Sequence, residues 1–271
     1  MLIAAHRGTF GGNIIQNTIS AFENALHQGA DILELDVSMS ADKNFFVFHS
    51  DLEPVLLGTT KKITSMDTEE IRKYRLYNNF NFLSNQRLNT LDEVLEHFKN
   101  RCLICIDRGW FCWNEILSYV NKYGAKDQII LKSPVREQLV NAVSEVYVQY
   151  MPIIHEVKDI GVVLQNQLHS EFVEVVFSSN KSEISEKRFI EKMLNRSVKL
   201  WVNAITLDDK TVLSGGHDDN KSILQNPDIG WGWLIDKGFD IIQTDWPSLL
   251  RKYINHRKAK ERNLECCSET I

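Results

Sequence analysis

Short apolar runs alternate along the chain with amphipathic stretches, and this alternation predicts the secondary structure. Most of the apolar runs are continuous, which is typical of parallel strands covered on both faces. We expect strands at Leu2–Ala5, Ile32–Val37, Cys102–Ile106, Gln128–Lys132, Tyr150–Ile154, Phe172–Phe177, Val198–Ile205 and Asp240–Thr244. Helical spacing between them predicts helices at Thr18–Gln28, Leu91–Phe98, Val135–Val146, Ile184–Leu194 and Pro247–Tyr253. Eight strands with intervening helices predict an α/β fold, a single (β/α)8 TIM-type barrel.

Two local features refine this pattern. The apolar run Phe45–Phe48 follows the second strand after only a short turn, whereas parallel neighbours need a longer crossover. We therefore expect it to pair antiparallel with the second strand as a hairpin arm, which would bring His49 back over that strand. Asn17 is the expected N-cap of the first helix, and Thr90 precedes the second.

Two long polar segments and a charged end complete the chain. Residues 51–89 and 207–233 are weakly periodic, and we expect loops or small insertions over the barrel mouth, where substrate contacts are often found. Residues 256–271 alternate charges and contain few apolar positions. The expected organisation is one barrel domain over residues 1–255 and a charged, fraying C-terminal tail over residues 256–271.

Composition places the chain among ordinary globular proteins. Of its 271 residues, 43% are hydrophobic and 25% are charged, which allows a sizeable core. The formal net charge of −5 argues against nonspecific nucleic-acid binding, although it leaves room for a locally positive pocket. Composition does not fix the oligomeric state.

The cysteines and the hydropathy pattern bear on the location of the protein. The chain has five cysteines, an odd number, and its one CxxC (Cys102 and Cys105) lies in an apolar run. Buried, reduced strand thiols explain this better than a redox or zinc site. Because the start lacks a basic signal region and no apolar run reaches transmembrane length, we expect a cytoplasmic protein without stable membrane insertion.

Acidic side chains gather at the ends of predicted strands, where the active site of a barrel enzyme lies. Glu34 and Asp36 are two apart and face the same side of one strand, and Asp107 follows the adjacent strand. Neighbouring carboxylates repel unless a cation neutralises them or one is protonated, and oxygen ligands suit Mg²⁺ or Ca²⁺. We therefore predict a divalent metal site here, against the alternative of a solvated acidic pair.

Two histidines flank this acidic pair. His6 follows the first strand and His49 follows the hairpin arm, and imidazole can act as acid or base near neutral pH. We predict that they form a catalytic acid–base pair, without assigning the two roles. His155 also follows a strand, but no motif supports it.

Cations and aromatic side chains at other strand ends predict substrate contacts. Arg7 and Lys132 can hold phosphate oxygens, although Arg7 could instead form a salt bridge to a barrel carboxylate. Trp201 and Asn203 lie on the seventh predicted strand, and Trp246 follows the eighth. We expect these three to line a pocket for an organic leaving group, with core packing as the alternative for the tryptophans.

The motifs resemble those of the glycerophosphodiester phosphodiesterase family. HRG, NT, GADILELDV and HSD carry the resemblance in the first fifty residues, and TLDEVLEHF, WVNAI and GFDIIQTDWP extend it to about residue 250. The resemblance implies a PI-phospholipase-C-like barrel, a divalent metal, usually Mg²⁺ or Ca²⁺, and cleavage of a phosphodiester into an alcohol and a phosphomonoester. By position, it implies His6 and His49 as catalytic residues and Glu34 and Asp36 as metal ligands.

Three positions depart from that family's pattern. Where the family has a strand like IExK, this chain has IDRGW, so Asp107 takes the acid position and the family's lysine is missing. Lys132, one strand over, is the candidate replacement. Gln16 stands in place of the usual glutamate of ENT, and Ser50 makes HSD of the common HD.

The resulting hypothesis is a metal-dependent hydrolase of a small phosphodiester. One histidine would take a proton from a substrate hydroxyl that attacks phosphorus, the other would protonate the departing alcohol, and water would open the cyclic phosphate. A glycerol diester and a sugar diester of the agrocinopine kind both stay open as substrates. A lysophospholipid is less favoured because no membrane-facing apolar loop stands out. A noncatalytic phosphoester-binding barrel is the alternative from another class.

Overall fold

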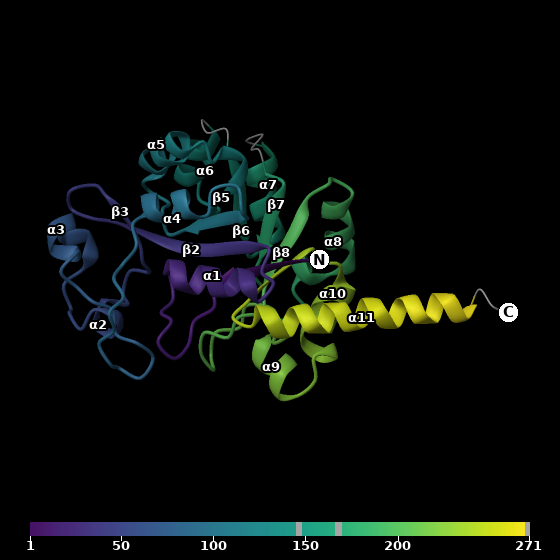
Figure 1. Ribbon diagram of the computed structural model, residues 1–271. Helices are drawn as coiled ribbons and strands as arrows, with labels where there is room; N and C mark the ends of the chain where they lie inside the picture. Colours follow the sequence, from purple (N-terminus) through teal and green to yellow (C-terminus); the bar gives the residue numbers. More distant parts are fainter. Residues whose placement is uncertain (145–147, 166–169, 269–271) are drawn as a thin grey trace.

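The computed structural model describes residues 1–144, 148–165 and 170–268, which form a closed barrel (Figure 1). Within these residues, eight parallel strands pair in the order β1-β9-β8-β7-β6-β5-β4-β2, and β1 also pairs with β2 to close the ring. They are β1 (Leu2–His6), β2 (Ile32–Met39), β4 (Leu103–Asp107), β5 (Ile129–Pro134), β6 (Gln149–Ile154), β7 (Phe172–Val175), β8 (Lys199–Asn203) and β9 (Ile241–Thr244). The predicted (β/α)8 barrel is confirmed, and each expected strand lies within two residues of its predicted ends.

Strand β3 (Phe45–Val47) lies outside the ring as an antiparallel arm of β2. Val47 pairs with Val37, and the backbone N–H of Phe48 donates to the carbonyl oxygen of Asp36 at 2.9 Å. The expected hairpin is therefore confirmed, and it returns the chain to the level of Asp36 just before His49.

Helices connect the strands and pack on the outside of the ring. They are α1 (Ile19–His27), α2 (Glu53–Leu56), η1 (Ile63–Ser65), α3 (Thr68–Ile71), α4 (Leu91–His97), α5 (Trp113–Tyr123), η2 (Lys126–Gln128), α6 (Glu137–Ser144), α7 (Val157–Gln165), η3 (Glu183–Ser185), α8 (Lys187–Leu194), α9 (Asp219–Leu224), η4 (Asp228–Gly232), α10 (Trp233–Lys237) and α11 (Pro247–Ser268). The five predicted helices correspond to α1, α4, α6, α8 and α11, whereas α5 and α7 were not predicted. Residues 145 and 146, the predicted end of the third helix, lie outside the described residues.

The helix caps follow local hydrogen bonding, with one correction to the sequence analysis. Helix α4 begins with a capping box between Thr90 and Glu93. The N-cap of α1 is Thr18, whose hydroxyl accepts from the backbone N–H of Ala21. Asn17, the predicted cap, has a φ of 57° and turns its side chain toward Asp36 instead.

An apolar floor closes the inside of the barrel below the mouth. Each strand of the ring contributes one buried residue to it: Ala4, Ile32, Cys105, Ile130, Met151, Phe172, Trp201 and Ile241. Two larger clusters fill the space between the ring and the outer helices. Burial raises the pKa of the Cys105 thiol well above its ordinary value, which fits the buried strand thiol that we expected.

The segment 51–89 is an insertion with a small core of its own, built around Phe46, Phe48, Ile63 and Met66. Its turn beyond Asn78 carries three exposed apolar side chains, Phe80 at 69%, Phe82 at 69% and Leu83 at 60% exposure. This turn corrects the expectation that no apolar loop stands out.

The C-terminal end also differs from the expectation. Residues 256–268, expected as a fraying tail, continue α11, which extends beyond the barrel in Figure 1. Residues 269–271 lie outside the described part of the chain. No helix among the described residues combines the length and apolar character needed to cross a membrane.

Candidate active site

Above the apolar floor, the inward-facing positions become polar. Residues two apart on a strand share a face, so the residue two positions after each floor residue also points into the barrel. On seven of the eight ring strands that residue is polar: His6, Glu34, Asp107, Lys132, Glu174, Asn203 and Gln243. On β6 it is Ile153. This polar layer lies toward the C-terminal ends of the strands, the face where barrel enzymes hold their sites.

Three carboxylates of this region come close enough to share a metal ion. Glu34, Asp36 and Asp107 each offer an oxygen, and these oxygens lie within 4.8 Å of one another. Asp36 and Asp107 stand opposite each other in the pairing of β2 with β4. The structure thus brings together the three predicted ligands, and an all-oxygen donor set suits Mg²⁺ or Ca²⁺.

The residues that follow Asp107 hold its carboxylate in place. Its Oδ1 accepts from the backbone N–H of Arg108 at 2.6 Å and from the indole N–H of Trp110 at 2.8 Å. Gly109 between them packs so closely that a Cβ there would lie 2.2 Å from Ile116 Cδ1, which must then move, and 3.0 Å from Val37 Cγ2. The unusual IDRGW sequence therefore orients the third acid of the cluster.

Lys132 is buried among carboxylates. Its Nζ lies 3.3 Å from Glu34 Oε1, 3.2 Å from Asp107 Oδ2 and 3.4 Å from Glu174 Oε2. Burial opposes a charge on this amine, but the three carboxylates outweigh it and raise the pKa of Lys132 well above its ordinary value. Lys132 is thus a permanent cation of the cluster, and a direct contact with phosphate stays a prediction.

Arg7 adopts the alternative considered for it. Its Nε forms an ion pair with Asp36 Oδ2 at 2.9 Å, and its backbone N–H donates to Glu34 Oε2 at 3.2 Å. Its Nη1 donates to Gln16 Oε1 at 3.0 Å. The neutral Gln16 therefore steadies the guanidinium without competing for its charge, which stays directed at Asp36.

The two acids of β2 differ in their electrostatics. Burial raises the pKa of Glu34 and outweighs the attraction of Lys132. Burial also acts on Asp36, but Arg7, His49 and the amide of Asn17 together hold the pKa of Asp36 below its ordinary value. The Asn17 amide donates to Asp36 Oδ2 at 3.0 Å, so the NT motif supports an ionised Asp36.

Each of the two predicted catalytic histidines has one ring nitrogen engaged. His6 Nδ1 donates to Asp245 Oδ1 at 2.9 Å, and His49 Nδ1 donates to the carbonyl oxygen of Ser50 at 2.5 Å. In both rings Nε2 is left as the nitrogen for proton transfer. Burial lowers the pKa of His49, and the neighbouring Arg7 adds to this effect against the opposing pull of Asp36.

Two further acids, Asp245 and Asp219, support His6, and neither has a predicted role. Asp219 Oδ2 accepts from the backbone N–H of Asp245 at 3.0 Å, and its Oδ1 accepts from Trp231 and Thr244, both at 2.8 Å. Burial raises the pKa of Asp219 to about 7. Asp219 therefore fixes the turn that presents Asp245 to His6.

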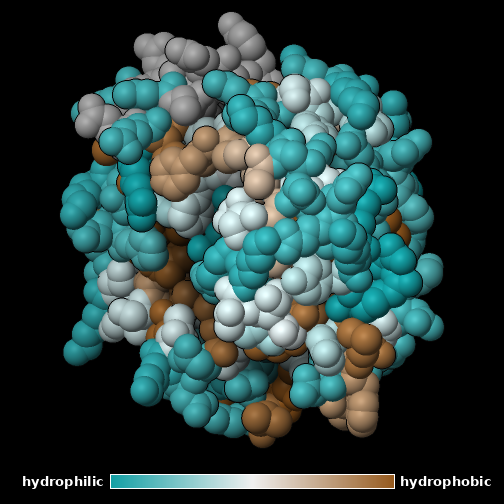
Figure 2. Space-filling model, turned by 90° about the vertical axis from the view of Figure 1, so that its left-hand side faces the viewer, coloured by the Kyte–Doolittle hydropathy of each residue, from teal (hydrophilic) through white to brown (hydrophobic). Residues whose placement is uncertain are grey.

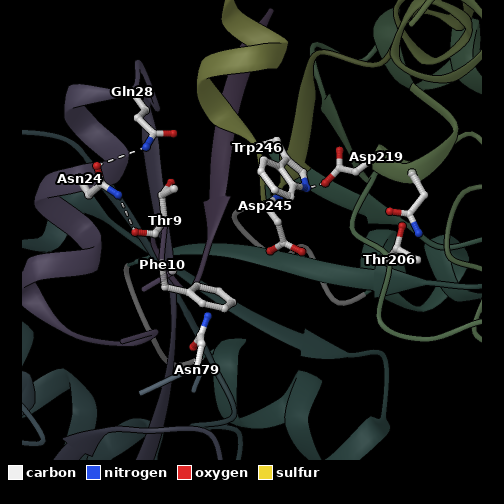
Figure 3. A pocket seen from close by; sticks show the side chains of 11 residues that line it. Thr9, Phe10, Asn24, Gln28, Asn79, Thr206, Asp219, Asp245 and Trp246 are labelled. Atoms are coloured by element: carbon white, nitrogen blue, oxygen red, sulfur yellow. Dashed lines mark hydrogen bonds between the residues drawn. The ribbon is translucent and has the colours of Figure 1, made fainter. Parts of the chain in front are cut away.

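The other residues predicted to contact the substrate lie in three different places: at the barrel mouth, beside Lys132, and in the apolar floor. Trp246 is half-exposed and lines a pocket beside Asp245 (Figure 3). Asn203 donates to Glu174 Oε1 at 2.6 Å and so belongs to the network around Lys132. Trp201 is a correction: it lies in the floor, fully buried, two residues too early on β8 to reach the mouth. His155 is exposed.

The mouth of the barrel is hollowed on the side that carries the insertion. Figure 2 views this face and shows the hollow among mostly hydrophilic side chains, with hydrophobic ones gathered toward its lower edge. The pocket beside Asp245 has a volume of about 580 Å³. It is large enough for a small organic ligand.

A barrel with buried carboxylates and two histidines at its mouth matches a known class of protein. The glycerophosphodiester phosphodiesterase of Caldanaerobacter subterraneus subsp. tengcongensis is 30% identical over 145 residues, 53% of this chain and 53% of that protein. The chain thus matches about half the length of that curated relative. A family model described as a domain of unknown function matches residues 150–254.

Solved structures share the fold over nearly the whole chain. A glycerophosphoryl diester phosphodiesterase from Parabacteroides distasonis superposes with a TM-score of 0.78 at 19% identity, covering 94% of this chain and 86% of that one. A phosphodiesterase from Oleispira antarctica, in complex with the product sn-glycerol-3-phosphate, gives 0.68 at 14% identity, covering 94% and 97%. The chain is thus similar in sequence to a curated glycerophosphodiester phosphodiesterase over about half its length, and it shares the fold of the solved structures over nearly its whole length.

Proposed function

We propose that the protein is a metal-dependent phosphodiesterase that hydrolyses a glycerol- or sugar-phosphodiester to an alcohol and a phosphomonoester. One observation carries the proposal: two histidines, each held through Nδ1 with Nε2 left for proton transfer, flank a buried cluster of three carboxylates at the mouth of the barrel. The similarity to the curated relative and the product bound to the Oleispira antarctica protein support the same reaction class.

The charge of the cluster supports a divalent cation. Four carboxylates, those of Glu34, Asp36, Asp107 and Glu174, face three cations among the described residues: Lys132, Arg7 and, at 3.9 Å from Asp36, the half-exposed Arg108. The surplus negative charge is buried, where it is costly unless a cation neutralises it. Glu34, Asp36 and Asp107 would hold the ion, which would polarise the phosphoryl oxygens when bound.

The positions of the histidines suggest their roles. Asp245 lines the pocket and holds His6 beside it. An alcohol group bound in the pocket would therefore separate from phosphorus next to the His6 ring. His6 would then protonate the departing oxygen from Nε2, while Asp245 holds the ring through Nδ1. His49 lies near Asp36, and burial keeps it neutral, as a base requires. It would take the proton from the attacking hydroxyl.

Phosphomonoester release from glycerol and sugar diesters, measured with Mg²⁺, Ca²⁺ or a chelator, tests the proposal. His6→Ala and His49→Ala should each reduce turnover by about 10²–10⁴-fold. His27→Ala, an exposed histidine at the end of α1, is the matched control and should keep full activity. Full turnover in either site variant, or binding of diesters without any turnover, would exclude the proposed mechanism and favour a noncatalytic binder.

A lysophospholipid is a second candidate substrate because of the exposed apolar turn. Phe80, Phe82 and Leu83 follow Asn79 directly, and Asn79 lines the pocket. An acyl chain could rest on this turn while its phosphodiester enters the site. Phe80→Ser should then lower the rate on lysophosphatidylcholine micelles and spare a water-soluble diester; an equal effect on both would remove this candidate.

A further inference from the structure

The pocket beside His6 is built mainly from uncharged polar groups. Its walls come from the loop after β1, helix α1, the insertion, and the segments after β8 and β9 (Figure 3). The side chains that bear amides or hydroxyls are Thr9, Asn24, Gln28, Asn79, Thr206 and Asn220. No lysine or arginine is among the described residues that line it. A second anionic group on the ligand would therefore find no counter-charge here.

Two of these hydroxyls have no partner. Thr9 is only 9% exposed, and neither its Oγ1 nor that of Thr206 makes a hydrogen bond within the described part of the chain. A buried hydroxyl without a partner costs free energy unless something else supplies the bond. Figure 3 shows the two threonines on opposite sides of the same hollow. Both hydroxyls are turned away from the open space, and because both side chains line the pocket, a rotation about χ1 would bring each hydroxyl to a ligand with several hydroxyl groups.

The two acids of the pocket are already engaged. Asp245 accepts from His6, and Asp219 accepts from Trp231, Thr244 and the Asp245 backbone. Burial raises the pKa of Asp219 to about 7, so its negative charge is weakened at neutral pH. Both carboxylates are thus oriented by groups of the protein, and a cationic head group would meet mainly the remaining negative charge of Asp245.

Two aromatic side chains complete the pocket. Phe10 and Trp246 point into the hollow with Asp245 between them (Figure 3). Aromatic faces pack against the C–H surfaces of a ring, and amides around them can both donate to and accept from hydroxyl groups. The volume of about 580 Å³ exceeds what a three-carbon alcohol would fill.

From these observations we infer that the pocket selects a neutral, hydroxyl-rich leaving alcohol, a cyclic polyol or a sugar, over a cationic or simple alkyl one. The inference rests on the proposed phosphodiesterase function and specifies its substrate class. The polyol oxygen bonded to phosphorus would lie next to His6, which gives it a proton as the P–O bond breaks. Thr9, Thr206 and Asn79 would hydrogen-bond the remaining hydroxyls.

The test compares three diesters that differ only in the leaving alcohol. They are sn-glycero-3-phospho-myo-inositol, sn-glycero-3-phosphocholine and sn-glycero-3-phosphoethanol, with release of sn-glycerol-3-phosphate as the measure. The inositol diester should have a kcat/KM about tenfold or more above the other two. Thr206→Val and Asn79→Ala should each lower the inositol-to-ethanol ratio about three- to tenfold, the effect of a lost hydrogen bond. Asn195→Ala, an exposed amide on the C-cap of α8, should leave the ratio unchanged.

The outcomes separate the inference from the function on which it rests. Three results would overturn the inference and leave the phosphodiesterase function intact. They are equal rates on all three diesters, a preference for the choline diester, or an inositol-to-ethanol kcat/KM ratio that Thr206→Val does not change. If none of the diesters is cleaved, the proposed function fails. Calorimetry with free myo-inositol then decides on the pocket: weaker binding to Thr206→Val than to the wild type supports the polyol site, and no binding to either overturns it.

Discussion

Replacing Lys132 with methionine tests whether its ammonium holds the acidic cluster together. Methionine keeps most of the side-chain length and removes the charge. In the wild type, the ammonium lies 3.2–3.4 Å from oxygens of Glu34, Asp107 and Glu174, all inside the barrel. The substitution leaves these three carboxylates facing one another without that cation.

The expected cost follows from this burial. Removing one partner of a buried ion pair costs about 3–5 kcal/mol, because the remaining charge stays desolvated. For a chain of this size, each kcal/mol shifts Tm by roughly 2–4 °C, so the variant should melt roughly 6–20 °C lower in chelator. Saturating Mg²⁺ should raise the Tm of Lys132→Met more than that of the wild type, since in the variant the ion replaces the positive charge that Lys132 supplied to the carboxylates.

Thermal and urea unfolding of both proteins, with chelator and with Mg²⁺, measure these quantities. Lys122→Met is the matched control: its ammonium lies 2.9 Å from Asp92 but is 63% exposed, so the loss should stay below about 1 kcal/mol. If Lys132→Met loses no more than this control, or if Mg²⁺ stabilises both proteins equally, the carboxylates do not depend on Lys132. The account of the cluster as a buried charge balance would then be wrong.

Three further predictions concern groups that support the site. Asp245→Asn should lower kcat at least tenfold in a diesterase assay, since the amide can present its NH₂ to His6 Nδ1 and so change the tautomer and orientation of the ring; an unchanged kcat would contradict this. Gly109→Ala should lower the free energy of unfolding by about 1–3 kcal/mol, because its methyl collides with Ile116, whereas Gly161→Ala, in open space on α7, should not destabilise. Because the pKa of Asp219 is raised from 3.8 to about 7, the wild type should lose stability as the pH rises between those values. The free energy of unfolding of Asp219→Asn, measured with urea, should therefore rise by about 4 kcal/mol relative to that of the wild type between pH 4 and pH 7. A difference that stays constant with pH would refute this.

The sequence predicts the ring of strands well because most of the strands are nearly continuous apolar runs with a polar residue at or near the C-terminal end. The same pattern could have located Glu174 and Gln243, which the sequence analysis did not assign. Each lies two residues after a floor residue, Phe172 or Ile241, and therefore faces inward. The same two-residue spacing on β8 explains why Trp201 lies in the apolar floor while Asn203 lies in the polar layer above it.

Pairings between distant residues were harder to foresee. Nothing local in the sequence indicates that Asp245 faces His6, because 239 positions separate them and only the closure of β9 onto β1 joins them. Arg7 had two chemically reasonable partners, and the choice depends on a φ of 55° that turns its side chain toward Asp36. The helices α5 and α7 were not predicted although their buried residues recur at helical spacing: Trp113, Ile116 and Val120 on α5, and Ile160 and Val163 on α7.

The position of Lys132 shows that a cation needed at one level of a barrel can come from a neighbouring strand. In the pairing of β4 with β5, Cys105 lies opposite Ile130 in the floor, so Asp107 and Lys132, each two residues on, share the level above it. Neighbouring strands lie about 4.8 Å apart, a gap that a lysine side chain spans with ease. A cation missing from the β4 motif can therefore be supplied from β5 without moving the backbone. We propose that Lys132 takes the place of the lysine missing from β4. A comparison of motifs strand by strand would then record a lost lysine, although the inward layer keeps a cation.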